Sequence, residues 1–422
     1  MPTVLLWGLQ AAHGGPATQG AGDMPIAVTR DWPGLKPFDD VVTAFMRARS
    51  IPGGALAVSR NGKLVLARGY GWADRESGEP VSPHSLFRIA SVSKPITAVA
   101  VLQLIERSGG RVTLDTPAFA LLGYPRRPGE GADPRLARVT IRDLLQHTAG
   151  WDAAKSFDPM FRPIEIARAV GVRSPAGPEA IIRYMLGHPL DHDPGSTYAY
   201  SNFGYCVLGR VIERLSGEGY EQYVKDAVLA PLGIRDMRLG RSLLRHRAPG
   251  EVRYYDAGVS ENVMTPEEGD SVPTPYGGFH VEAMDAHGGW IASAADVVRF
   301  ACAFDDPHHS PLLRPETIAT MFARPNGQPG YEPDGRPKAA YYACGWMVRP
   351  TSDGRANHWH TGRVAGASSL LVRRHDGLNW AVLFNQSSDP SGLSYDDIDP
   401  ALHRAADAVK SWPDGDLFAP AR

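Results

Sequence analysis

The chain of 422 residues lacks several features that would mark a specialised class of protein. It has only three cysteines, Cys206, Cys302 and Cys344, which are far apart and form no CxxC pair. A disulfide framework is therefore not indicated, and a single disulfide bond is left as an alternative. It has no run of about 18 apolar residues, so we expect no membrane-spanning helix. With 44 basic and 46 acidic side chains, the formal charge of −2 gives no general electrostatic reason to bind nucleic acid or an anionic membrane.

The start of the chain also lacks a positive segment ahead of its short apolar patch, so we predict no secretory signal. The compartment therefore stays open: the cytoplasm is slightly favoured, and a periplasmic or secreted location would follow if the N-terminus were truncated. Residues 1–30 are rich in Gly, Ala, Pro and Thr without periodicity, and we predict a loose tail there. Over the whole chain, a hydrophobic content of 43% and a charged content of 21% are typical of an ordinary globular protein.

Strand and helix patterns divide the chain into two ends and a middle. Strand-like runs lie near both ends, the first two joined by an Asn-Gly hairpin signal: 54–60, 63–69, 339–348, 358–361, 367–373 and 378–385. Apolar residues at helical spacing predict helices over 37–49, 90–108, 141–146, 179–186, 205–215, 293–303 and 400–409. The simplest architecture is α+β, with an antiparallel sheet built from both chain ends. We predict an α/β lobe over 31–115 and 271–422, and an inserted helical lobe with long loops over 116–270.

The first candidate for chemistry is the sequence Ser91-Val-Ser-Lys94 at a predicted helix start. Serine is a weak nucleophile at neutral pH unless a base lies within hydrogen-bonding reach. Lysine three residues later lies on the same helix face, and burial would lower its pKa enough for it to act as that base. Ser93 is the rival nucleophile, but it has no lysine at this spacing. An isolated match of this kind is usually a capped helix with a solvated lysine, whereas here the helix that follows is long and apolar.

Two further short motifs carry suitable side chains. Tyr200-Ser-Asn202 supplies a phenol that could be held as phenolate or relay a proton, and an amide that could bind a substrate carbonyl or the lysine. His360-Thr361-Gly362 supplies an imidazole, a hydroxyl and a glycine that would allow close approach of a substrate. Each motif alone is weak, and their order along the chain is the stronger signal. A zinc site at His358 and His360 lacks a third ligand, so we expect no metal.

With these motifs in this order, the chain resembles the serine β-lactamase and penicillin-binding-protein-like family. The phrases Phe87–Pro95, Leu144–Gly150, Tyr200–Gly204 and Gly288–Ser293 support the resemblance, which covers about residues 37 to 410. The Tyr-x-Asn form is similar to the class C-like branch, which includes family VIII carboxylesterases and D-Ala-D-Ala carboxypeptidases. The resemblance implies the β-lactamase/transpeptidase-like fold and a serine hydrolase that needs no cofactor.

Carried over motif by motif, the resemblance implies a role for each residue. Ser91 would be the acylated nucleophile, Lys94 its proton acceptor, and Tyr200 a proton relay to the leaving group. Substrate binding would fall to Asn202, His360, Thr361 and Gly362. The oxyanion hole would use the backbone N–H groups of Ser91 and Arg363.

Two departures from the family pattern concern the substrate. Typical class C β-lactamases have lysine where this chain has His360, and that lysine helps to bind a carboxylate. Arg363 stands where a small residue is usual, and its cation would either replace the missing charge or point to solvent. Aromatic residues of the loops 152–178 and 253–287 could shape an apolar acyl pocket, or simply pack their own loops.

Three functions follow. We expect a serine hydrolase that acts on a carboxylic ester through an acyl-enzyme. The alternative is a D-Ala-D-Ala carboxypeptidase, a D-aminopeptidase or a weak class C-like β-lactamase. The third is a sensor or binding module that is acylated without turnover. In each case the partner is a small molecule (an ester, or a short peptide or amide), with no nucleic acid involved and the oligomeric state left open.

Overall fold

The computed structural model describes residues 24–124, 133–389 and 391–418. Its main feature is a nine-stranded antiparallel sheet in which strands from the two ends of the chain lie side by side. Strand β2 from the first part of the chain pairs with β14 from the last part, so that Leu56 lies opposite Val382. In order across the sheet the strands are β1 (Ile26–Val28), β3 (Lys63–Asp74), β2 (Gly53–Arg60), β14 (Leu378–Phe384), β13 (Ala367–Arg373), β12 (Ala356–Val364), β11 (Met347–Pro350) and β10 (Tyr341–Tyr342), with β4 (Glu79–Pro80) beside β3.

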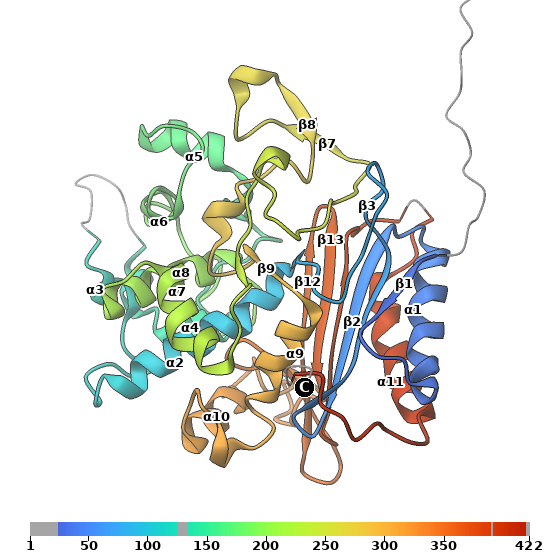
Figure 1. Ribbon diagram of the computed structural model, residues 1–422. Helices are drawn as coiled ribbons and strands as arrows, with labels where there is room; N and C mark the ends of the chain where they lie inside the picture. The colour runs from blue at the N-terminus through green and yellow to red at the C-terminus, as the bar shows by residue number, and fades with distance from the viewer. Residues whose placement is uncertain (1–23, 125–132, 390, 419–422) are drawn as a thin grey trace, which may run out of the picture.

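The two faces of this sheet are covered by different helices (Figure 1). On one face α1 (Lys36–Ala48) packs with α11 (Ile398–Ala408) over a core that includes Phe38 and Trp380. On the other face lies α9 (Ala294–Cys302), which begins at the predicted Ser293 cap. Beyond α9 lies the helical region, so the sheet separates the α1–α11 layer from the rest of the molecule.

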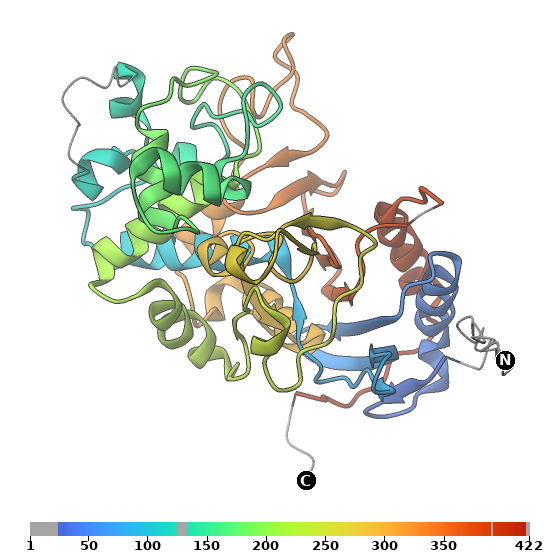
Figure 2. The same cartoon turned by 90° about the horizontal axis from the view of Figure 1, so that it is seen from above.

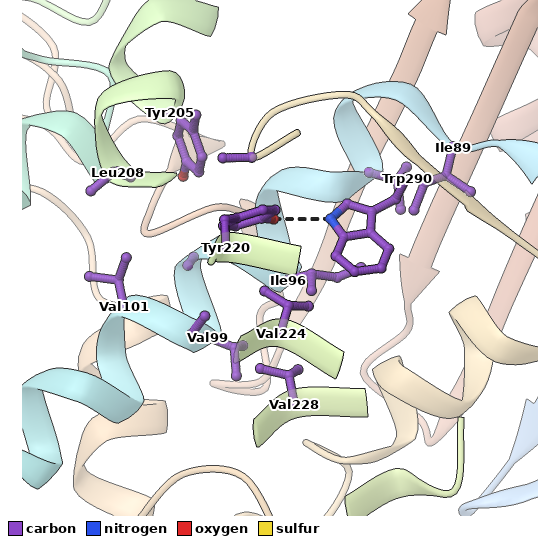
Figure 3. Packing of buried hydrophobic residues seen from close by; sticks show 14 of the residues in the cluster. Ile89, Ile96, Val99, Val101, Tyr205, Leu208, Tyr220, Val224, Val228 and Trp290 are labelled. Atoms are coloured by element: carbon purple, nitrogen blue, oxygen red, sulfur yellow. Dashed lines mark hydrogen bonds between the residues drawn. The ribbon is translucent and has the colours of Figure 1, made fainter. Parts of the chain in front are cut away.

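The helical region is built around α2 (Ser93–Arg107), whose residues 93–104 are all buried. A helix that is buried all round is a central core element. Its neighbours are α3 (Ala118–Leu122), α4 (Ile141–Leu145), α5 (Pro163–Val170), α6 (Pro178–Met185), α7 (Asn202–Ser216), α8 (Tyr220–Val224) and α10 (Pro315–Phe322). Figure 3 shows the core of this region, where the indole N–H of Trp290 donates to the Tyr220 hydroxyl at 3.0 Å. The predicted α+β fold, with a sheet from both chain ends, is confirmed.

Several predicted elements are reproduced and others are corrected. The 54–69 hairpin is confirmed, because Asn61 and Gly62 both have positive φ, at 50° and 76°, as a type I′ turn requires. The predicted strand 339–348 is two strands, because the chain turns at Gly345 (φ 84°), where a Cβ would lie 2.7 Å from that of Ala98.

The ordered chain also begins earlier than the predicted tail allows. Ile26–Val28 form strand β1 along β3, since these apolar residues complete the sheet edge, while residues 1–23 lie outside the described part. The described part of the segment 116–270 contains helices and long loops, but it also contains β6 (Arg238–Leu239) and β7 (Val259–Glu261), the latter paired with β8 (Ser271–Pro273). The boundaries predicted for the two lobes stay a prediction. In the described residues, no helix has the length and apolar character needed to cross a membrane.

Candidate active site

Ser91 lies in a one-turn 3-10 helix, η2 (Ala90–Val92), between strand β5 (Phe87–Arg88) and α2. Strand β9 (Trp290–Ala292) holds this turn from behind, and the N–H of Ile89 donates to the Trp290 carbonyl at 3.0 Å. Ala90 has φ of 45°, an uncommon value for a residue with a side chain. Such backbone strain persists only where the surrounding structure enforces it.

The two serines of the first motif differ in their exposure to solvent. Ser91 is half-buried, whereas Ser93 is fully buried and its hydroxyl has no hydrogen-bond partner among the described residues. A substrate therefore has access to Ser91 and not to Ser93.

Lys94 has no exposed surface and is surrounded by acceptors. Its Nζ donates to Ser91 Oγ at 3.1 Å, to Asn202 Oδ1 at 2.8 Å and to the carbonyl of His287 at 2.9 Å. Burial holds the pKa of Lys94 well below its ordinary value, and the charge of Asp158 opposes that effect. The predicted pairing of Ser91 with a buried lysine is thus present in the geometry.

Asn202 is the first residue of α7, whose N-terminus is capped by Ser201. Its Oδ1 accepts from Lys94, while its Nδ2 donates to Asp158 Oδ2 at 2.7 Å. Asp158 was not predicted from the sequence, because an Asp-Pro pair in a loop is typical of a helix cap. It is indeed such a cap, since Asp158 Oδ1 accepts from the N–H of Met160. Burial raises the pKa of Asp158, and its hydrogen bonds and Lys94 partly offset that rise.

Tyr200 lies beside Lys94, with Nζ 4.7 Å from the ring centroid. Burial raises the pKa of Tyr200, and the nearby Ser91 side chain opposes the rise. The phenol therefore keeps its proton at neutral pH, and of the two states considered from the sequence the proton relay fits better than the phenolate.

His147 accepts hydrogen bonds from the backbone on both sides of Tyr200. Its carbonyl accepts from the N–H of Ala199 at 2.9 Å, and its Nδ1 accepts from the N–H of Ser201 at 3.2 Å. Its ring lies 4.3 Å from that of Tyr200. His147 was not predicted as a site residue, although it lies in the segment Leu144–Gly150 that supports the family resemblance.

His360 forms part of the site on strand β12. Its Nδ1 donates to the carbonyl of Thr361 at 2.7 Å, so its Nε2 is left to accept from the Tyr342 hydroxyl at 3.0 Å. Burial, reinforced by the charge of Lys94, lowers the pKa of His360 to about 3. The imidazole is therefore neutral near pH 7, and both nitrogens are occupied.

Gly362 lies directly against the turn that carries Ser91. A Cβ at this position would be 2.3 Å from the carbonyl oxygen of Ile89 and 3.1 Å from the Ser91 nitrogen. Strand β11 pairs with β12 only as far as Trp359, so β12 continues beyond its partner along the Ser91 turn. Only glycine allows this approach.

Thr361 and Arg363 alternate to the opposite face of β12 from His360. They line a cavity of about 460 Å³ together with Gly362, Tyr395, Asp396, Ile398 and Asp399, among others. The Arg363 guanidinium lies 3.7 Å from Asp396 Oδ1 and 5.5 Å from the centroid of the Tyr395 ring. Strand β12 thus places Gly362 against the Ser91 turn, whereas the side chains of Thr361 and Arg363 lie on the other face, where Arg363 is directed toward an acidic partner. The contact of Thr361 with substrate stays a prediction.

The two aromatic-rich loops meet each other near this site. Phe161, 48% exposed, lies 6.4 Å from Phe279 between ring centroids, and His280 Nδ1 lies 3.1 Å from the carbonyl of Ala176. Other aromatics in or beside these loops pack against neighbouring elements, as Trp151 does against Phe203 of α7 and Phe157 does against Tyr184 of α6. Strands β7 and β8 of the second loop lie at the top of the molecule in Figure 1, between α5 and the upper end of β3, and the same yellow segment is in front in the view from above in Figure 2. Within the described residues, no three His, Cys, Asp or Glu side chains are grouped so as to hold a metal ion.

Known proteins are similar to this chain in sequence and in fold. The sequence profile of the Beta-lactamase family matches residues 38–404. Esterase EstB of Burkholderia gladioli is 32% identical over 365 residues, which cover 82% of this chain and 89% of EstB.

Two solved structures share the fold. The penicillin-binding protein homologue of Pyrococcus abyssi has a TM-score of 0.64 at 24% identity, with 85% of this chain and 75% of that chain covered. The D-amino acid amidase of Ochrobactrum anthropi SV3 has a TM-score of 0.65 at 22% identity, with 90% and 99% covered.

Proposed function

Because the chain belongs to the Beta-lactamase family and is a serine hydrolase of that fold, we propose that it cleaves carboxylic esters through an acyl-enzyme on Ser91. EstB, an esterase by name, supports this substrate class over most of the chain length. No step of the proposed reaction requires a cofactor.

The base in this proposal is Lys94. An ammonium has three N–H donors, and all three are occupied here, by Ser91, Asn202 and His287. Loss of one proton leaves two donors for the fixed acceptors Asn202 Oδ1 and His287 O. The lone pair then faces Ser91, whose O–H donates to it. Since burial favours the neutral amine, Lys94 can take the serine proton as Oγ attacks the ester carbonyl carbon.

The other groups complete the reaction. The backbone N–H groups of Ser91 and Arg363 would hold the tetrahedral oxyanion, a contribution of about 3–4 kcal/mol per donor in comparable enzymes. Tyr200, a protonated phenol beside Lys94, would donate a proton to the departing alkoxide and recover it from Lys94. A water molecule would then attack the acyl-enzyme by the reverse transfers and release the acid and Ser91.

One observation favours esters over substrates with a free carboxylate: both candidate carboxylate-binding side chains are already engaged. His360 is neutral and hydrogen-bonded at both nitrogens. The cation of Arg363 lies near Asp396, in a cavity that Asp399 also lines. A peptide or lactam carboxylate would meet no free cation from these two residues, whereas a neutral ester needs none.

The test is parallel kinetics on p-nitrophenyl butyrate, a D-Ala-D-Ala peptide and nitrocefin. Ester turnover should exceed the other two by at least about 100-fold in kcat/KM. Faster peptide or lactam turnover would contradict the ester assignment, and an acyl adduct without turnover would indicate a sensor.

Three variants test the proposed roles in the same assay. Ser91→Ala should abolish turnover, with Ser93→Ala as the matched control that retains it. Lys94→Ala should cost several orders of magnitude, so a loss under about tenfold would exclude it as the base. Tyr200→Phe should lower kcat more than it changes KM, by about 10²–10⁴-fold, and an unchanged rate would exclude the proton relay.

A further inference from the structure

We propose that Asp158 is a positioning residue for the Ser91–Lys94 pair: it fixes, through Asn202, which atom of that amide faces Lys94, and it places a negative charge in the same buried cluster. This inference rests on the proposed function, in which Lys94 is the base. It concerns a residue that no motif of the sequence includes.

The carboxylate of Asp158 is held at both oxygens. Oδ1 accepts from the backbone N–H of Met160 at 3.0 Å, which caps the turn η4 (Pro159–Phe161). Oδ2 accepts from Asn202 Nδ2 at 2.7 Å. Because the backbone fixes one oxygen, the other stays directed at Asn202 and does not have to be ordered when substrate binds.

This contact determines the orientation of the Asn202 amide. With Nδ2 bound to Asp158, Oδ1 is the atom that lies 2.8 Å from Lys94 Nζ. A flipped amide would point N–H donors at an ammonium that needs an acceptor. It would also offer a donor to the lone pair of the neutral amine, in competition with the Ser91 hydroxyl. Asp158 thus keeps the lone pair of Lys94 available to Ser91.

The charge of Asp158 has a second effect. The titratable groups around Lys94 and Asp158 are Asp158 itself and, from the packed elements, His147, His287, His360, Tyr200, Tyr205 and Cys206. Burial lowers the pKa of the three histidines and raises that of the tyrosines and the cysteine, so these groups are neutral near pH 7. Asp158 is therefore the charge that favours the ammonium form of Lys94.

Two variants separate orientation from charge. Asp158→Asn removes the charge and keeps one oxygen, which can still accept from Asn202 when the cap on the Met160 N–H is given up. Asp158→Leu has a side chain of similar size and removes both the acceptor for Asn202 and the charge. Asp152→Asn is the matched control, because Asp152 lies in the same loop but its carboxylate contacts His192 instead.

The pH profile of kcat/KM on p-nitrophenyl butyrate is the main readout. In Asp158→Asn the acid limb of this profile, which reports protonation of Lys94, should move to lower pH by about one unit. The plateau value of kcat/KM should stay within about threefold of that of the native enzyme. Asp158→Leu should lose at least about 30-fold on the plateau. An unmoved limb in Asp158→Asn would refute the charge effect, and equal plateaus in the two variants would refute the orientation effect.

A direct titration keeps the inference testable if Asp158→Leu does not fold. The ¹³Cε resonance of Lys94, assigned from its disappearance in Lys94→Arg, should titrate at lower pH in Asp158→Asn than in the native protein or in Asp152→Asn. An identical midpoint would refute the charge effect. Lys94→Ala separates the proposed function from the role of Asp158: if this variant remains active the proposed function fails, whereas an inactive Lys94→Ala with no shift in Asp158→Asn refutes only the charge effect of Asp158.

Discussion

The hydroxyl of Tyr342 lies 3.0 Å from Nε2 of His360 and donates to it, so the imidazole serves as an acceptor within the protein. A neutral ring in this bond offers a substrate carboxylate neither a charge nor a free N–H. His360 therefore contributes to the wall of the site without attracting anions, and this property suggests how specificity could be changed.

Replacing His360 by lysine should shift specificity toward substrates with a carboxylate. The ammonium would supply the missing cation, so we expect the ratio of kcat/KM for nitrocefin to that for p-nitrophenyl butyrate to rise about tenfold. His360→Gln is the control, since it changes the ring without adding charge and should leave the ratio within about threefold. Equal ratios in the lysine and glutamine variants would show that charge at this position does not select the substrate.

Arg363 should stay outside the substrate site even when it is released from Asp396, because its side chain lies on the opposite face of β12 from His360. The pair is exposed and 3.7 Å apart, and such pairs are worth about 0–1 kcal/mol, so Asp396→Asn should leave kcat/KM for nitrocefin within about twofold of the native value. The neighbouring Asp397→Asn is the control, because Asp397 pairs with Arg49, and it should behave alike. A rise in kcat/KM for nitrocefin in Asp396→Asn alone would show that a released Arg363 reaches the carboxylate of the substrate.

The sequence predicted the parts of this site whose residue types carry chemistry at fixed spacing. Ser91 and Lys94 lie one helical turn apart, so local structure alone brings them together. Asp158 and His147 could not be identified in this way, because their contacts with Asn202 and Tyr200 arise only when distant loops pack around α7. The partner of Arg363 likewise could not be identified, because Asp396 comes close to it only when the turn before α11 packs beside β12.

Stability should fall in acid because several histidines are buried in the neutral form. Burial lowers the pKa of His358 to about 2, whereas the unfolded chain protonates it near its ordinary value of 6.5. The unfolded state therefore binds the proton first, and stability is lost as the pH falls from about 6 toward 3 by roughly 1.4 kcal/mol per unit per histidine. Urea unfolding of His358→Gln should show a shallower pH dependence than the native protein, with exposed His84→Gln as control. An unchanged slope would mean that His358 is already protonated in the folded state.

The close contact at Gly362 predicts that a side chain at this position lowers kcat in a protein that still folds. In Gly362→Ala the new methyl group would meet the carbonyl oxygen of Ile89 at 2.3 Å, so β12 and the Ser91 turn must move apart. A displacement of about 1 Å at reacting groups typically costs about 100-fold in rate, which we expect in kcat on p-nitrophenyl butyrate. Gly177→Ala is the matched control, because nothing lies within 4 Å of its added Cβ and its activity should be retained. Comparable kcat values in the two variants, with both proteins folded by circular dichroism, would show that the spacing between β12 and Ser91 tolerates a side chain.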